Sequence, residues 1–227
     1  MSARDFSTLV SARRATRAFL SDPVPTGWID DIIDLANRAP SAGNTQGWDF
    51  LVLDTPESVA TFWDTSLPVE RRSHFPWPEL LAAPVLVIPI CRPQSWVERY
   101  AEGDKAKTGL GRSAEDWSVP YWWIDTAFAA MTIQLAAQDR NLGTLFFGLF
   151  ERERTILDRF SVPTDRRALG AIAIGHPAPQ QRRSSSTLRR RRSAAETTHR
   201  NAWSLRRRRF GRNRRRCCIG DRERIDP

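Results

Sequence analysis

Long hydrophobic runs are missing from this 227-residue chain. No apolar stretch approaches the roughly 20 residues that a membrane-spanning helix needs. The N-terminal sequence MSARDFSTLVSARR has scattered charges and no apolar core of the kind found in secretory signals. At this length, with 41% hydrophobic and 27% charged residues, one sizeable soluble domain in the cytoplasm is expected.

Histidine and cysteine are scarce, with three of each. The histidines are too scattered for a metal site; Cys91 lies in an apolar run, and Cys217 and Cys218 are adjacent in a basic segment. HExxH, GxSxG, Walker A and GxGxxG patterns are all absent. The absent motifs argue against metallohydrolases, serine hydrolases, P-loop NTPases and Rossmann dehydrogenases. The three cysteines form no disulfide framework, which fits a reducing compartment.

The net charge of +9 is unevenly distributed. Residues 180–227 contain 17 arginines, no lysine and four acidic residues, a net charge of +13, whereas residues 1–179 carry a net charge of −4. The basic character therefore belongs to the C-terminal segment. If such a segment associates with nucleic acid at all, the association is expected to be non-specific, through salt-sensitive neutralisation of phosphates.

Three segments are expected along the chain: a folded domain over residues 1–179, an extension over 180–203 and a basic tail over 204–227. Arginine density rises and apolar periodicity disappears in the tail, so disorder is expected beyond about Trp203. An alternative is that the tail is not a selected protein sequence, because a GC-rich gene read out of frame also yields arginine-rich text.

Apolar periodicity predicts several elements. Phe6, Leu9 and Val10 predict a short first helix that ends in an arginine cluster, and Thr26 is expected to cap a second amphipathic helix ending before Pro40. Residues 124–138 are apolar on most of the helix circumference, which predicts a central buried helix. Strands are expected at 48–53, 83–91, 144–150 and 169–174, and a further helix at 152–160.

Several connections are too short for the crossovers of a parallel sheet, so an α+β domain around a mixed or antiparallel central sheet is expected. The stretches 54–81 and 92–119 are rich in Trp, Pro and charge, and they suggest loops or short helices over an active site.

Three segments carry candidate chemistry. The first is Arg13-Arg14-Ala15-Thr16-Arg17, because guanidinium groups on one helical turn suit a phosphate; a solvated basic face is the alternative. The second is residues 39–48 (APSAGNTQGW), whose small residues and amide side chains suit a flat heteroaromatic ligand, although an ordinary turn also fits. The third is residues 142–148 (LGTLFFG), a glycine-flanked strand that a ligand or a β-bulge would explain.

In this order, together with Asp125-Thr126-Ala127 and the closing GHP, these segments resemble the nitroreductase family over about the first 179 residues. The resemblance implies FMN as cofactor, NAD(P)H as co-substrate and a homodimer with a flavin at each interface. Electrons would pass by a ping-pong mechanism to a nitroaromatic, quinone or similar acceptor. Trp122, Trp123 and Phe128 are candidates for the dimer interface, or for burial within one subunit.

By this resemblance no side chain is catalytic, because the chemistry belongs to the flavin. Arg191 would return to the FMN phosphate, with Arg189 as the alternative, although arginines here replace the expected glycine and proline. The residues implied in FMN binding are Arg13, Arg14, Arg17, Pro40, Ser41, Ala42, Asn44, Gln46, Gly143, Thr144, Phe147, Gly148 and Arg191.

Other functions remain open on the sequence alone. A flavin-dependent dehalogenase or oxidase would keep the cofactor and change the reaction. A nucleic-acid-associating basic protein with a degenerate flavin site, or an FMN-poor pseudoenzyme, would instead be favoured by the altered C-terminal segment.

Overall fold

The computed structural model describes residues 5–179. Arg189, Arg191 and the segments 180–203 and 204–227 lie outside the described residues, so the expectations for them remain predictions. Within the described part, no helix is long and apolar enough to cross a membrane.

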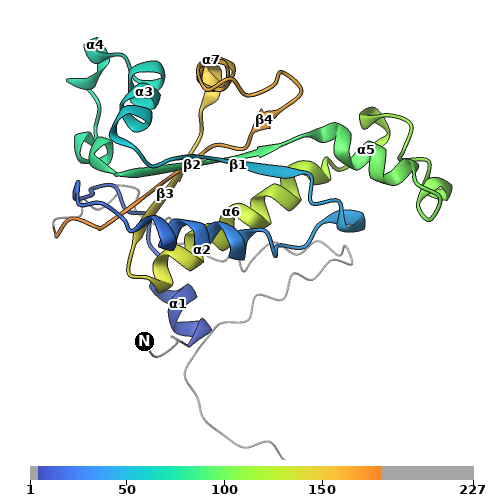
Figure 1. The fold of residues 1–227 in the computed structure, drawn as a ribbon, viewed down its shortest axis with the longest axis horizontal. Helices are drawn as coiled ribbons and strands as arrows, with labels where there is room; N and C mark the ends of the chain where they lie inside the picture. The colour runs from blue at the N-terminus through green and yellow to red at the C-terminus, as the bar shows by residue number, and fades with distance from the viewer. Residues whose placement is uncertain (1–4, 180–227) are drawn as a thin grey trace, which may run out of the picture. The chain divides into compact units, whose positions relative to one another are not determined.

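A five-stranded sheet forms the centre of the domain (Figure 1). Its strand order is β1-β2-β5-β3, with the short β4 also paired to β2, and every strand pair is antiparallel. This confirms the predicted α+β class. Of the two sheet types expected, mixed or antiparallel, the sheet is antiparallel. The strands are β1 (Trp48–Leu53), β2 (Val85–Cys91), β3 (Gly143–Phe147), β4 (Arg167–Ala168) and β5 (Ala171–Gly175).

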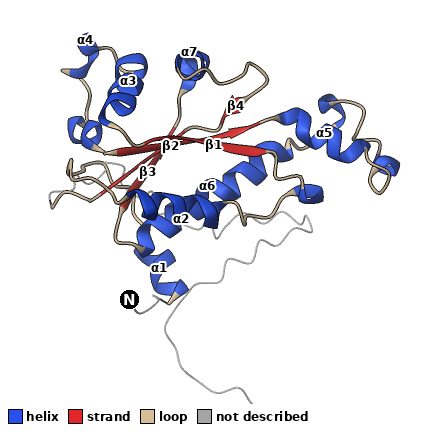
Figure 2. Ribbon diagram, in the orientation of Figure 1, coloured by secondary structure: helices blue, strands red, loops and turns tan. Residues whose placement is uncertain are grey.

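Helices cover both faces of the sheet (Figure 2). In the described residues they are α1 (Phe6–Ala12), α2 (Thr26–Ala36), α3 (Pro56–Ser66), α4 (Val69–Arg72), α5 (Pro93–Ala101), α6 (Tyr121–Asp139) and α7 (Glu153–Arg159), with short 3₁₀ turns between them. The stretches 54–81 and 92–119 thus contain short helices, one of the two conformations expected for them.

The central strand β2 divides the core into two layers. Val85 and Val87 belong to the cluster with α2 and α6, whereas Leu86 and Ile88 belong to the cluster with α3 and α7. Successive side chains of a strand point to opposite faces, so a strand covered on both sides is apolar throughout. This explains why β2 is buried along its entire length.

Two predicted helix boundaries are wrong. The first helix ends at Ala12, and Arg13 leaves it with a ψ angle of 127°. The three arginines therefore do not share a helical turn, because the chain after Arg13 extends to pair Ala15 with Thr144 of β3. Thr26 is the first residue of α2, not its cap, which is Pro25.

Helix α6 is central but not buried all round. Its packed face presents small residues and Ile133 to the sheet, whereas Tyr121, Phe128 and Met131 are 39–47% exposed. The stripe that contains Phe128 and Met131 therefore points away from the sheet of its own chain. Of the candidate interface residues, Trp122 is buried in the core and Phe128 is exposed.

Candidate functional site

The arginine segment lies at the open edge of β3. Thr16 N–H donates to the carbonyl of Thr144 at 2.9 Å, which fixes the segment there. Arg14 Nη1 donates to the carbonyls of Ser11 and Arg13, both at 2.8 Å. Among residues 5–179, neither Arg13 nor Arg14 has a carboxylate within ion-pair distance. Their positive charge is therefore available to an anion.

Arg14, Gly143 and Thr144, three of the residues implied in FMN binding, line a pocket of about 220 Å³. Its wall also includes Gln138, in the last turn of α6, and Asn141, two residues after that helix ends. A small pocket lined by a guanidinium group and by the polar side chains of Gln138 and Asn141 suits a phosphate-sized anion.

The remaining edge of β3 is open. Because Thr144 directs its carbonyl outward to Thr16, the alternation of an antiparallel ladder directs the backbone N–H and C=O of Phe146 outward as well. Neither group has a partner within the described residues. This edge therefore offers one donor and one acceptor to the edge of a heteroaromatic ring.

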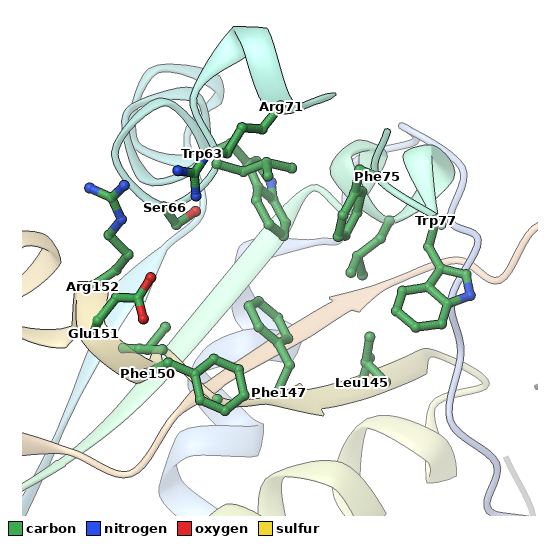
Figure 3. Close-up of a pocket in the computed structure, with 14 residues that line it drawn as sticks. Trp63, Ser66, Arg71, Phe75, Trp77, Leu145, Phe147, Phe150, Glu151 and Arg152 are labelled. Carbon is green, nitrogen blue, oxygen red and sulfur yellow. The ribbon is translucent and has the colours of Figure 1, made fainter. Parts of the chain in front are cut away.

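A larger pocket of about 320 Å³ lies beside the end of β3 (Figure 3). Phe147 and Gly148, both predicted, line it together with three aromatic residues that sequence reasoning missed: Trp63, Phe75 and Trp77. These three lie in the stretch 54–81, whose tryptophans were the available signal. A volume near 300 Å³ with apolar walls is typical of small-molecule sites.

Arg17 lines neither pocket, but it lies against Trp77, one of the residues that line the larger one. Its guanidinium carbon lies 5.4 Å from the ring centre of Trp77, a cation–π distance. Of the three predicted arginines, Arg14 alone lines one of these two pockets. Phe150, at the pocket mouth, has a left-handed φ of 48° and is 86% exposed.

The loop from Pro40 to Gln46 is strained and tightly held. Gly43, Asn44 and Gln46 have φ values of 65°, 54° and 48°. Ser41 Oγ accepts the Gln46 N–H at 2.9 Å. Such left-handed backbone is uncommon outside glycine and is found where surrounding contacts determine it.

Two side chains absent from the predicted set hold this loop. Asp125 Oδ2 accepts the N–H of Ala42 at 2.8 Å, and Arg99 Nε donates to the carbonyl of Gly43 at 2.8 Å. The sequence signal for Asp125 was that it is the only charged residue of the helix expected at 124–138. Nothing in the sequence pointed to Arg99.

The predicted residues form two groups at opposite ends of α6. The loop is tied to Asp125 near the helix start, whereas Gln138 near its end donates to Leu9 of the arginine segment's helix. Thirteen residues at 1.5 Å each separate these points by about 20 Å. One chain therefore does not bring the loop and the arginine pocket together.

Residues 5–179 also bear on metal and thiol chemistry. No cluster of His, Cys, Asp or Glu there could hold a metal ion. Burial raises the pKa of the Cys91 thiol to about 12, against a lowering by the charge of Arg167. Cys91 is therefore a neutral core residue at physiological pH and not a nucleophile.

Comparison with known proteins is consistent with this geometry. The chain is 26% identical over 183 residues to a protein of Methanothermobacter thermautotrophicus named as an NADH dehydrogenase/NAD(P)H nitroreductase, covering 78% of this chain and 80% of that one. The match to 4-nitrobenzoate reductase of Pseudomonas putida reaches 51% identity, but over 49 residues, so it spans only about a fifth of either chain.

Solved structures share the fold. A protein of Staphylococcus epidermidis named as an NAD(P)H:FMN oxidoreductase has a TM-score of 0.65 at 23% identity, over 83% of this chain and 94% of that one. A protein of Exiguobacterium sibiricum named as a nitroreductase, in complex with FMN, has a TM-score of 0.60 at 20% identity, over 81% and 95%. The profile of the Nitroreductase family matches residues 10–176, more than half of the chain. The chain therefore belongs to the nitroreductase family of oxidoreductases.

Proposed function

We propose that the protein is an FMN-dependent oxidoreductase that transfers reducing equivalents from NAD(P)H to a small electron-poor acceptor, such as a nitroaromatic or a quinone. The observation that carries the proposal is the combination at the β3 edge of unpaired guanidinium charge, open backbone groups and an aromatic-walled pocket. When bound, FMN supplies the redox chemistry, and the nicotinamide leaves before the acceptor binds.

The residues present fit the phosphate end of FMN. Arg13 and Arg14 lack carboxylate partners among the described residues, and the smaller pocket brings Arg14 together with the polar side chains of Gln138 and Asn141. A phosphate there would accept charge-assisted hydrogen bonds from the guanidinium groups. Gly143 and Thr144 would line the path from this pocket along β3.

The residues also fit the ring end. The outward N–H and C=O of Phe146 can pair with the donors and acceptors on the rim of the isoalloxazine, and Gly148 and Phe147 line the adjoining pocket. Arg17 would add positive potential, which favours electron density on the flavin. The apolar walls would exclude water from the reacting face.

A second copy of the chain would complete each site. Within one chain the Pro40–Gln46 loop lies at the far end of α6 from the arginine pocket. The exposed stripe of Tyr121, Phe128 and Met131 on α6 supports a homodimer, because an exposed apolar helix face of this kind commonly marks an interface. The partner's loop would then reach the flavin held by this chain.

The test is the absorbance spectrum of the purified protein after incubation with FMN, followed by anaerobic addition of NADPH. We expect oxidised-flavin bands that remain with the protein on gel filtration and bleach when NADPH is added. A protein that takes up no FMN would overturn the proposal. Retained FMN that neither NADPH nor NADH bleaches would overturn the oxidoreductase assignment while leaving flavin binding.

A further inference from the structure

Asp125 is a buried carboxylate on the packed face of α6. Asp125 is 2% exposed, and its neighbours along that face are alanines and Ile133. One oxygen, Oδ2, accepts both the Ala42 N–H and the Trp96 Nε1–H, each at 2.8 Å. A buried carboxylate is costly unless it is hydrogen-bonded, so these two donors account for its presence in the core.

The two donors come from different elements. Ala42 opens the short 3₁₀ turn of the Pro40–Gln46 loop, and Trp96 lies in α5 with its side chain fully buried. Trp96 also underlies the end of the loop, because a Cβ atom on Gly47 would lie 2.5 Å from its ring. Asp125 therefore joins the loop, α5 and α6 at one atom.

Arg99 of α5 holds the same loop from its other side. Its Nε donates to the Gly43 carbonyl at 2.8 Å, and its two terminal nitrogens donate to the Asp104 carboxylate at 2.7 and 2.9 Å. Asp125 and Arg99 thus satisfy one donor and one acceptor at the loop residues that precede Asn44. The side chain of Asn44 remains exposed and has no hydrogen-bond partner within residues 5–179.

We propose that Asp125 is a positioning residue that holds the Pro40–Gln46 loop in its strained, ligand-binding conformation before any ligand arrives. The inference rests on the proposed function for the identity of the ligand, FMN, but not for the order of the loop. Left-handed backbone costs nothing at Gly43, but at Asn44 and above all at Gln46 it is maintained only where surrounding contacts outweigh its cost. Without the Asp125 acceptor the loop would populate other conformations, and the apparent FMN dissociation constant would rise in inverse proportion to the fraction of molecules whose loop remains competent.

The test compares Asp125→Leu, which removes the acceptor at similar volume, with Asp125→Asn, which keeps a neutral acceptor. Asp139→Asn is the matched control, since Asp139 is an exposed carboxylate at the other end of α6. The first readout is hydrogen exchange of residues 39–47 in the flavin-free protein. We expect the loop amides to exchange on the order of 10-fold faster in Asp125→Leu, the loss of a charge-assisted hydrogen bond, and about 3-fold faster in Asp125→Asn. The control should match the wild type.

The second readout is the FMN dissociation constant. It should rise on the order of 10-fold for Asp125→Leu and less for Asp125→Asn, in the same rank order as the loop exchange rates. A purely structural role would accelerate exchange throughout the sheet as well, and that result would overturn the proposal. Unchanged loop exchange in Asp125→Asn would overturn it too, even if Asp125→Leu fails to fold. A wild-type protein that binds no FMN would instead refute the proposed function, and the exchange comparison would still decide the role of Asp125.

Discussion

Thr16 fills the space that a side chain on Gly143 would need. A Cβ atom built on Gly143 would lie 2.5 Å from Thr16 Oγ1 and 2.7 Å from its methyl carbon. Both residues are buried, and the backbone N–H of Thr16 donates a hydrogen bond to the carbonyl of Thr144, the next residue of β3. The glycine at the start of β3 is thus explained by close approach of the arginine segment, not by a bulge or a need for positive φ.

Substitution Gly143→Ala should displace the arginine segment from β3. Contacts this short force a shift of the buried Thr16, and overpacking of this kind typically costs about 1–3 kcal/mol of folding free energy. We expect a lower Tm in thermal unfolding and weaker FMN binding. Gly27→Ala is the control, because a Cβ atom there meets nothing within 4 Å; equal effects at both positions would contradict the close-packing explanation.

Arg14→Ala should weaken FMN binding on the order of 10-fold, since a charge-assisted hydrogen bond contributes about 1.5–3 kcal/mol. Riboflavin lacks the phosphate, so its affinity should change little. Fluorescence titration with both flavins separates the two effects. Arg159→Ala, an exposed arginine on α7, should alter neither affinity. Equal losses for FMN and riboflavin would show that Arg14 does not serve the phosphate.

Phe128→Glu should produce monomers. A charge in the centre of the exposed stripe of α6 would have to be desolvated when two copies associate. Light scattering after gel filtration measures the change in mass, and FMN should be lost with the partner's loop. Val69→Glu, which alters an apolar residue 65% exposed on α4, should leave the mass unchanged. A wild-type protein that is already monomeric would refute the interface.

Cys91 should make folding stability fall at alkaline pH. Burial raises the pKa of its thiol from 9.0 to about 12, so the unfolded chain loses this proton before the folded one does. The contribution of the neutral thiol is therefore intact below about pH 9 and is lost as the pH rises toward 12. Through this thiol, the free energy of unfolding should decrease by up to about 1.4 kcal/mol per pH unit. Denaturant unfolding from pH 8 to 11 should give a shallower slope for Cys91→Ala; parallel slopes would contradict the shift.

Local sequence patterns were sufficient to predict single helices and strands. The apolar run from Trp48 to Leu53 is a strand with the predicted bounds, and the helix expected at 124–138 lies within α6. Short connections also favoured an α+β fold, because they leave no room for parallel crossovers. The order of the three candidate segments carried the family resemblance, which the family profile supports.

Tertiary structure decided what these segments do to one another. The spacing of Arg13, Arg14 and Arg17 fits a helix equally well, and only the pairing of Ala15 with Thr144 draws the chain into an extended form. The exposed side of α6 was equally hidden, because a helix that is apolar all round has no periodicity to identify its packed face. Asp125 reaches Ala42 across 83 residues. A sequence determines its local periodicities, whereas contacts at such separation exist only once the chain has packed.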